Sequence, residues 1–168
     1  MEKNFLSNLG FRFVLSRTPE MNFFVQSVTL PAIDLGQFDL EDPFVRLPQP
    51  GTKLNFNPLS LTFLVNEDMD NYLEIFDWLN GLGFPENFNQ YSNFVGNQGA
   101  VGPTSTQEFS DGSLMILSSH KNPSLKVTFQ DMFPISLSDL NFDSTMTDVE
   151  YLRATVTFRY RLYTIEKI

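Results

Sequence analysis

The chain of 168 residues carries 11 basic and 20 acidic residues, and its net charge of −9 argues against a grip on a nucleic-acid backbone, which depends on Lys and Arg. It contains no cysteine, which excludes a disulfide framework and a thiolate metal site, and no apolar run is long enough to span a membrane. The length suits a single domain over residues 1–168, and we expect no signal peptide at its start.

Two short strands are predicted first. In residues 11–16, Phe11, Phe13 and Leu15 alternate with more polar positions, and residues 23–30 form a second strand that ends at Pro31. A turn separates the two segments. We expect them to pair as a hairpin that opens an antiparallel sheet.

Residues 32–58 combine several prolines and acids with large apolar side chains. The prolines argue against a central strand, and the apolar residues argue against a free linker. An extended arm or loose hairpin that docks on another surface satisfies both observations. The alternative is an arm that folds back on its own domain and plugs one end.

A buried strand and the only convincing helix follow. Leu61, Phe63 and Val65 share one side of the strand 59–65, and Asn66 or Asp68 can cap a helix over about 68–81. Spacing of three and four residues predicts the helix core. Its members are Met69, Tyr72, Leu73, Phe76, Trp78 and Leu79.

Residues 83–110 read as a long irregular stretch. The Gly, Asn and Gln content of its second half predicts that residues 96–106 are mobile in the free subunit and ordered only by neighbours. The sheet then resumes with strands at 113–119 and 125–132, followed by an extended connector at 133–138. The last strand alternates clearly. Its inward side is expected to hold Ala154, Val156, Phe158, Tyr160 and Leu162, with Tyr163 on the other side.

These elements predict a mainly β fold. We expect an antiparallel barrel or sandwich of about six to seven strands, with one flanking helix and long extended arms or loops. The 18 phenylalanines either fill the core or lie at subunit interfaces, where aromatic residues are enriched.

No pattern in the chain indicates enzymatic chemistry. His120 is the only histidine and belongs to a turn sequence, so we expect it to be solvated. Glu67, Asp68 and Asp70 are explained by helix N-terminal capping rather than by a cation site. We expect no catalytic residues, no cofactor and no metal.

Three blocks carry a resemblance to a known family. They are Leu30-Pro31; Gly51-Thr52-Lys53 leading through 59–65 to Asn66-Glu67, Tyr72 and Phe76-Asp77-Trp78; and Phe133-Pro134-Ile135, Leu140, Phe142-Asp143 and the strand 154–160. In this order and spacing the chain resembles the tail tube proteins of contractile-tailed bacteriophages, including the related proteins that start the tube on the baseplate. Residues 83–110 do not match the pattern.

The resemblance implies a structural subunit of the virion tail. Six subunits would form a ring in which neighbouring sheets join into a barrel around a lumen, and rings would stack into a tube that guides the tape-measure protein and then the genome. Sheath, baseplate or terminator proteins are the implied partners, with no membrane. An acidic lumen would let DNA pass without binding, by like-charge repulsion.

The residues expected at subunit interfaces lie mainly in the arm. They are Phe38, Leu40, Phe44, Val45, Arg46, Leu47, Arg159 and Arg161. We expect the arm to dock on a subunit of the adjacent ring. The two arginines are either solvated or paired with acids of a neighbour, and we favour the pairing.

Two alternatives to the tube subunit remain open. A tube initiator or baseplate adaptor would share the fold but bind a non-identical ring. A soluble carbohydrate- or protein-binding β-domain would use residues 83–110 as its binding loop.

Overall fold

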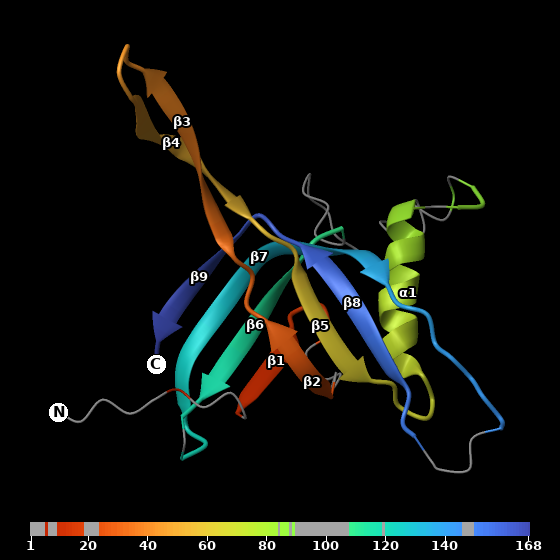
Figure 1. Ribbon diagram of the computed structural model, residues 1–168. Coiled ribbons are helices and arrows are strands. Elements are labelled where there is room, and N and C mark those ends of the chain that lie inside the picture. The colour runs from red at the N-terminus through yellow and green to blue at the C-terminus, as the bar shows by residue number, and fades with distance from the viewer. Residues whose placement is uncertain are drawn as a thin grey trace, which may run out of the picture.

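The computed structural model describes residues 6, 10–18, 24–83, 85–87, 89, 108–118, 120–145 and 150–168. Within this part of the chain, strands dominate and one helix flanks them (Figure 1). The elements are β1 (Phe11–Leu15), β2 (Val25–Thr29), β3 (Ile33–Glu41), β4 (Arg46–Phe56), β5 (Leu59–Leu64), α1 (Asp70–Gly83), β6 (Ser110–Leu117), β7 (Pro123–Leu137), β8 (Arg153–Arg159) and β9 (Leu162–Lys167). The mainly β prediction with one flanking helix is confirmed.

The body of the molecule is one strongly curved antiparallel sheet. Its strands follow the order β1-β6-β7-β8-β5-β2, and β9 pairs with β7. The predicted hairpin of the first two strands is wrong, because β1 pairs with β6 whereas β2 pairs with β5. Strands this short pair with whichever partner the tertiary fold supplies, so their closeness in sequence does not decide their partner.

A bend in the long strand β7 folds the sheet onto itself. The first part of β7 pairs with β6 and β9, and the part from Phe133 pairs with β8. Asp131 lies at the bend with a positive φ of 52°. Aspartate tolerates this left-handed conformation better than most residues.

The bend changes two predictions. The segment 133–138, expected to be a connector, continues β7 as far as Leu137. The final strand, expected to run without interruption, breaks at Tyr160-Arg161 into β8 and β9. Beyond the break the inward side changes, so that Tyr163 rather than Leu162 packs against the core. A break opposite the bend keeps both strands paired with β7.

The core lies between the two halves of the folded sheet. Strands β5 and β8 alternate as predicted, with their buried side chains turned inward. The largest fully buried side chains include Trp78 from the helix and Phe63, Phe129 and Phe158 from three strands. Burial of this apolar surface is the main stabilising contribution to the body.

Helix α1 is joined to the end of β5 by two asparagines. The backbone N–H of Asn71 donates to Oδ1 of Asn66 at 3.4 Å, and the N–H of Asn66 donates to Oδ1 of Asn71 at 3.3 Å. The side-chain nitrogen Nδ2 of Asn71 also donates to the backbone carbonyl of Leu64 at 2.7 Å. Asn66 therefore caps the helix, and the fully buried Asn71 fixes its position on the sheet.

The buried side of α1 differs from the predicted helix core. Asn71, Ile75, Trp78 and Gly81 are buried, whereas Leu73 and Phe76 are 44% and 45% exposed. Tyr72 and Leu79 are partly buried against the core, and Met69 precedes the helix with a φ of 58°. The prediction counted only apolar residues. The side-chain amide of Asn71, however, donates to the carbonyl of Leu64 at the end of β5, and this bond turns the side of α1 that carries Asn71 towards the sheet.

Most of the predicted irregular stretch 83–110 lies outside the described residues. So does the predicted mobility of its second half, 96–106. The described residues 108–110 lead directly into β6.

Trp78 links the helix to several parts of the body. Its indole Nε1 donates to the carbonyl of Glu108 at 3.2 Å, and its ring lies 6.1 Å from that of Phe158. The guanidinium of Arg17 lies 5.1 Å from the ring centroid and pairs with Glu74 at 3.0 Å.

We therefore expect Trp78→Ala to lower the free energy of unfolding by about 3–5 kcal/mol, because it leaves a cavity and removes these contacts. The matched control is Leu73→Ala on the exposed side of the same helix, which should change it by only about 0.5 kcal/mol. Urea unfolding of both variants measures the difference. Equal destabilisation would contradict the packing of α1 described above.

Candidate assembly surfaces

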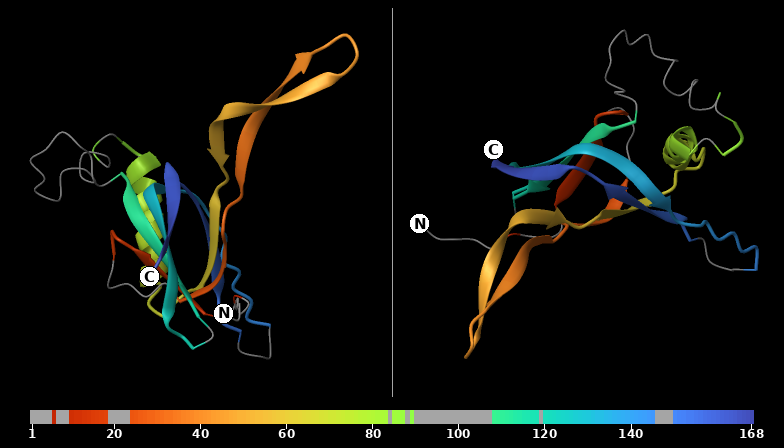
Figure 2. Two further views of the ribbon diagram at one scale, coloured as in Figure 1. Left: turned by 90° about the vertical axis from the view of Figure 1, so that its left-hand side faces the viewer. Right: turned by 90° about the horizontal axis from the view of Figure 1, so that it is seen from above.

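The strands β3 and β4 form an arm that projects from the body. They pair only with each other, as an antiparallel hairpin. Both views of Figure 2 show the arm standing away from the sheet, so it does not fold back to plug the domain. Regular pairing replaces the loose hairpin that we expected. Pro48 and Pro50 occupy alternate positions of a strand with a free outer edge, where a missing N–H is tolerated.

The predicted interface residues gather at the far half of the arm. Leu40 lies opposite Leu47, and Phe38 lies opposite Gln49, so these side chains share one face. Phe44, which is 96% exposed, and Val45 lie at the turn. We call Phe38, Leu40 and Leu47 the tip face.

The opposite side of the far half is charged. Asp39 and Glu41 alternate with the apolar residues of β3, and Arg46 lies directly opposite Glu41. Arg46 therefore belongs to the polar side and not to the tip face. The far half of the arm is amphipathic, with one apolar and one charged side.

The near half of the arm carries a second apolar face that the sequence analysis missed. Ile33 lies opposite Phe56, and Leu35 lies opposite Leu54. Ile33, Leu35 and Leu54 are 45%, 52% and 54% exposed, and we call them the base face. Because they are separated in sequence by polar and small residues, only their cross-strand pairing reveals them as one surface.

An aromatic cluster anchors the arm to the body. The ring of Phe56, at the end of β4, lies 6.1 Å from that of Tyr160 and 5.6 Å from that of Tyr163. Both tyrosines also contact Phe129 of β7 edge-on or tilted, at 5.1 and 5.5 Å. Such pairs contribute about 0.5–1.5 kcal/mol each beyond area burial.

Two tyrosine hydroxyls hold the chain on both sides of the arm. Tyr160 donates to the carbonyl of Asn57 at 2.7 Å, after β4, and Tyr163 donates to the carbonyl of Pro31 at 3.2 Å, before β3. Asn57 also closes the root by donating its N–H to the carbonyl of Ala32 at 3.1 Å. Burial raises the pKa of Tyr160 to about 12, so its hydroxyl stays a donor far into the alkaline range.

The two arginines of the final strands lie in different settings. Arg159 is exposed at the end of β8. Arg161 pairs with Asp131 of the same chain at 3.2 Å and donates to the side chain of Gln130 at 2.9 Å. Arg161 thus has an acidic partner within its own chain, because the bend in β7 places Asp131 within reach. Pairing of the two arginines with acids of a neighbour stays a prediction.

The body offers further surfaces for association on α1 and at the edges of its sheet. Leu73 and Phe76 form an exposed apolar strip on α1. In the described pairing, β1, β2 and β9 each pair on one side only, so they are sheet edges. Ile165 and Ile168 at the β9 edge are 54% and 68% exposed. Free edges of this kind are templates for pairing with another chain.

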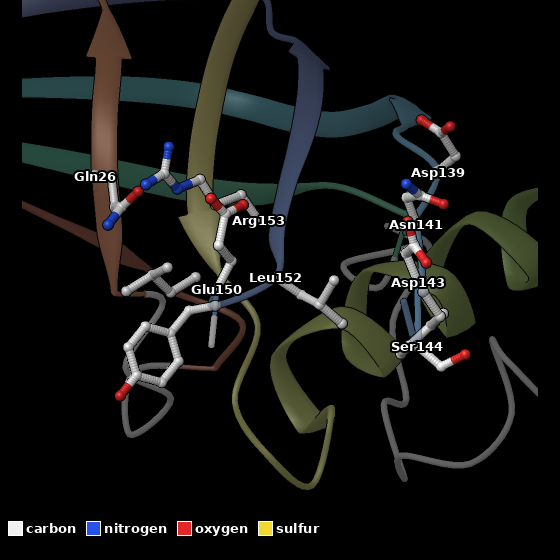
Figure 3. A pocket seen from close by; sticks show the side chains of 11 residues that line it. Gln26, Asp139, Asn141, Asp143, Ser144, Glu150, Leu152 and Arg153 are labelled. Atoms are coloured by element: carbon white, nitrogen blue, oxygen red, sulfur yellow. The ribbon is translucent and has the colours of Figure 1, made fainter. Parts of the chain in front are cut away.

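An open groove of about 1020 Å³ lies beside the connector between β7 and β8. Figure 1 shows this connector on the side of the body away from the arm. Figure 3 shows Asp139, Asn141 and Asp143 along one wall and Gln26 and Arg153 on the other. The carboxylate of Asp143 already accepts two hydrogen bonds, from the hydroxyl of Thr145 at 2.6 Å and from its backbone N–H at 2.9 Å. These bonds lower the pKa of Asp143. The groove presents polar groups without a nucleophile and base in contact.

The described residues hold no group of three or more His, Cys, Asp or Glu side chains arranged to bind a metal ion. His120 is exposed in the turn between β6 and β7. Among the described helices, none combines the length and apolar character needed to cross a membrane.

Comparison with known proteins agrees with a structural role. The sequence model of the family "Phage tail tube protein" matches residues 3–166. The tail tube terminator protein of Enterobacteria phage T4 is 25% identical over 146 residues, which cover 84% of this chain and 76% of that protein.

Two solved structures share the fold. The tube-terminating cap of the anti-feeding prophage superposes with a TM-score of 0.69 at 15% identity, covering 100% of this chain and 95% of that one. A chain of the sheath–tube complex of an extracellular contractile injection system, PVC, superposes with a TM-score of 0.66 at 15% identity, covering 97% and 92%.

The arm anchor predicts a specific loss of stability in alkali. Since the pKa of Tyr160 is raised from 10.0 to about 12, the folded chain binds the proton more tightly than the unfolded chain. The contribution of the protonated Tyr160 hydroxyl to the free energy of unfolding is complete below about pH 10 and is lost as the pH rises through about 12. Two pKa units correspond to about 3 kcal/mol.

Urea unfolding between pH 9 and pH 12, roughly the interval that this linkage spans, measures the loss. The control is Tyr160→Phe, which keeps the ring and removes the titrating hydroxyl. We expect the wild type to lose its advantage over this variant across the interval. Parallel pH profiles for the two proteins would exclude the buried hydroxyl as the cause.

Proposed function

The chain belongs to the phage tail tube protein family, and from this premise we propose that six copies form a ring that stacks with others into the tube of a contractile tail. The family is a structural one of the virion tail, so the chain is a structural protein and not an enzyme. The proposed tube guides a tape-measure protein and then DNA. A net charge of −9 suits a conduit that must not retain a polyanion.

The observation that carries the proposal is the projecting arm. It holds large apolar side chains in water, among them Phe38 at 54% and Phe44 at 96% exposure. Each such side chain would contribute about 1.5–3 kcal/mol on full burial. A second copy of the chain is the partner that a tube subunit always has within reach.

The exposed sheet edges support ring formation. An edge of one subunit can pair with an edge of the next, and a ring closes when the rotation between neighbours returns to its start. Stacking then requires that the two faces of a ring complement each other. A sheath around the tube is the further partner that the sheath–tube similarity favours.

A second candidate function is termination of the tube. It is favoured by the similarity to the tail tube terminator of phage T4 and to the cap of the anti-feeding prophage. A terminator needs only one ring face that binds the tube, whereas a tube subunit needs two faces that bind each other. An initiator or adaptor of the same fold would likewise bind a non-identical ring. Because the chain belongs to a tail tube family, the alternative of a soluble carbohydrate- or protein-binding β-domain has no support.

Assembly of the purified chain separates these functions. Sedimentation and negative-stain microscopy over a range of concentration and salt should show tubes of variable length for a tube subunit. Single rings that attach to one end of tubes made by another protein would identify a terminator or adaptor instead. A chain that stays monomeric under all conditions would contradict both functions.

The arm gives a sharper prediction. We expect Phe38→Ser combined with Phe44→Ser to abolish tubes while leaving the melting temperature of the monomer nearly unchanged, because both side chains are exposed in the single chain. Gln37→Ser, on the same strand and also exposed, is the control. Calorimetry and microscopy check the two outcomes. A much lower melting temperature of the double variant would mean that the arm belongs to the core of its own subunit.

A further inference from the structure

The bend in β7 contains one extra residue. Gly112 of β6 pairs with Phe129 and Ser110 pairs with Met132, so β6 advances by two residues while β7 advances by three. The extra residue makes a bulge, which bends the strand and increases its twist. Directly after the bulge, Met132 is fully buried, and a Cβ on Gly112 would overlap its sulfur. The position of the bulge is therefore fixed by packing inside the core.

Polar contacts fasten the bulge to the strands on both sides of β7. From β6, Oδ1 of Asp111 accepts the backbone N–H of Asp131 at 3.1 Å. From the break between β8 and β9, the guanidinium of Arg161 reaches two successive residues of the bulge. Its Nε lies 3.2 Å from Oδ2 of Asp131, and its Nη2 donates to Oε1 of Gln130 at 2.9 Å. We call Asp111, Gln130, Asp131 and Arg161 the bend joint.

The bend joint is too exposed to be a main source of stability. The side chains of Arg161 and Asp131 are 65% and 45% exposed. Ion pairs between exposed side chains contribute little to the free energy of unfolding, because water and salt screen them. The contacts of a forked guanidinium are nevertheless directional. This combination suits a group that fixes an orientation more than one that holds the fold together.

Arg161 lies between the two tyrosines that hold the arm. Tyr160 precedes it directly, and Tyr163 follows two residues later. The tyrosine hydroxyls donate to the carbonyl of Asn57, after β4, and to the carbonyl of Pro31, before β3. In the described pairing, β3 and β4 pair only with each other. The contacts at the root of the arm therefore decide the direction in which it leaves the body.

We propose that Arg161 is a positioning residue for the arm: by fixing the break between β8 and β9 against the bulge, it fixes the two tyrosines and thereby the direction of the arm. Burial of the tyrosine rings against Phe129 stabilises the root, but apolar burial is not directional. With the bend joint closed, the arm has one direction. With the joint open, the arm swings about its root. The proposal concerns the single chain and does not depend on the proposed function.

Energy transfer between two dyes on single molecules measures the direction of the arm. The chain contains no cysteine, so Asp39→Cys on the arm and Asp77→Cys on α1 supply two exposed labelling sites. Each chain is observed alone at high dilution, which removes any effect of assembly. The labelled chain without further changes should give one narrow distribution of transfer efficiency.

Two substitutions open the bend joint from its two sides. Arg161→Gln removes the guanidinium, and Asp131→Asn removes the charge while tolerating the φ of 52° at this position. We expect each to broaden the distribution of transfer efficiency and to leave the urea midpoint nearly unchanged. The double variant should broaden it no further than either change alone, because both residues act through one contact.

Arg159→Gln is the matched control. Arg159 lies two residues before Arg161, is exposed, and forms no ion pair among the described residues. We expect it to leave the distribution narrow. A narrow distribution in Arg161→Gln, or equal broadening in the control, would overturn the proposal. A lower urea midpoint of Arg161→Gln with a narrow distribution would also overturn it, since Arg161 would then stabilise the body without positioning the arm.

The link from the bend joint to the arm can be tested by itself. Tyr160→Phe combined with Tyr163→Phe keeps both rings and removes the two hydroxyl hydrogen bonds to the root. We expect this variant to broaden the distribution as Arg161→Gln does, because the hydroxyls transmit the position of the break to the arm. A distribution as narrow as that of the unchanged labelled chain would overturn the proposal.

Discussion

The bend in β7 at Asp131 is the constraint on which the rest of the structure depends. It allows one strand to pair with β6 and β9 before the bend and with β8 after it, so that a single sheet folds over its own core. Arg161 stabilises the bend from the opposite strand, through its ion pair with Asp131 and through its backbone N–H, which donates to the carbonyl of Gln130 at 2.9 Å. A straight β7 would leave the inner side of β8 without a facing layer.

The same bend positions the arm. Tyr160 lies at the break between β8 and β9, and Tyr163 lies in β9 just beyond it. Their hydroxyls hold the chain just after β4 and just before β3. The direction of the arm is therefore coupled to the packing of the core through Phe129, which contacts both tyrosine rings. In the proposed tube, this coupling would let the body of one subunit determine where its arm meets other copies.

The arm and the body use their apolar residues differently. In the body, side chains such as Phe63 and Phe158 are buried within the single chain. In the arm, Phe38 and Leu35 remain about half exposed, and no other part of the described chain covers them. Stability of the subunit and stability of the proposed assembly thus reside in separate groups of residues, which is why variants of the arm can be designed without unfolding the body.

Local periodicity by itself determined the alternation of β5 and β8, the existence of α1 and the placement of exposed apolar residues such as Phe44 in an arm, because each depends on residues close in sequence. The tertiary structure alone decided that β1 pairs with β6, that Asn71 turns its side of α1 inward, and that Arg161 pairs within its own chain. It also revealed the base face, since Leu35 and Leu54 become neighbours only through the strand register. Partner choice, register and bends depend on contacts between distant segments, and these contacts have no signature in the spacing of residues along the chain.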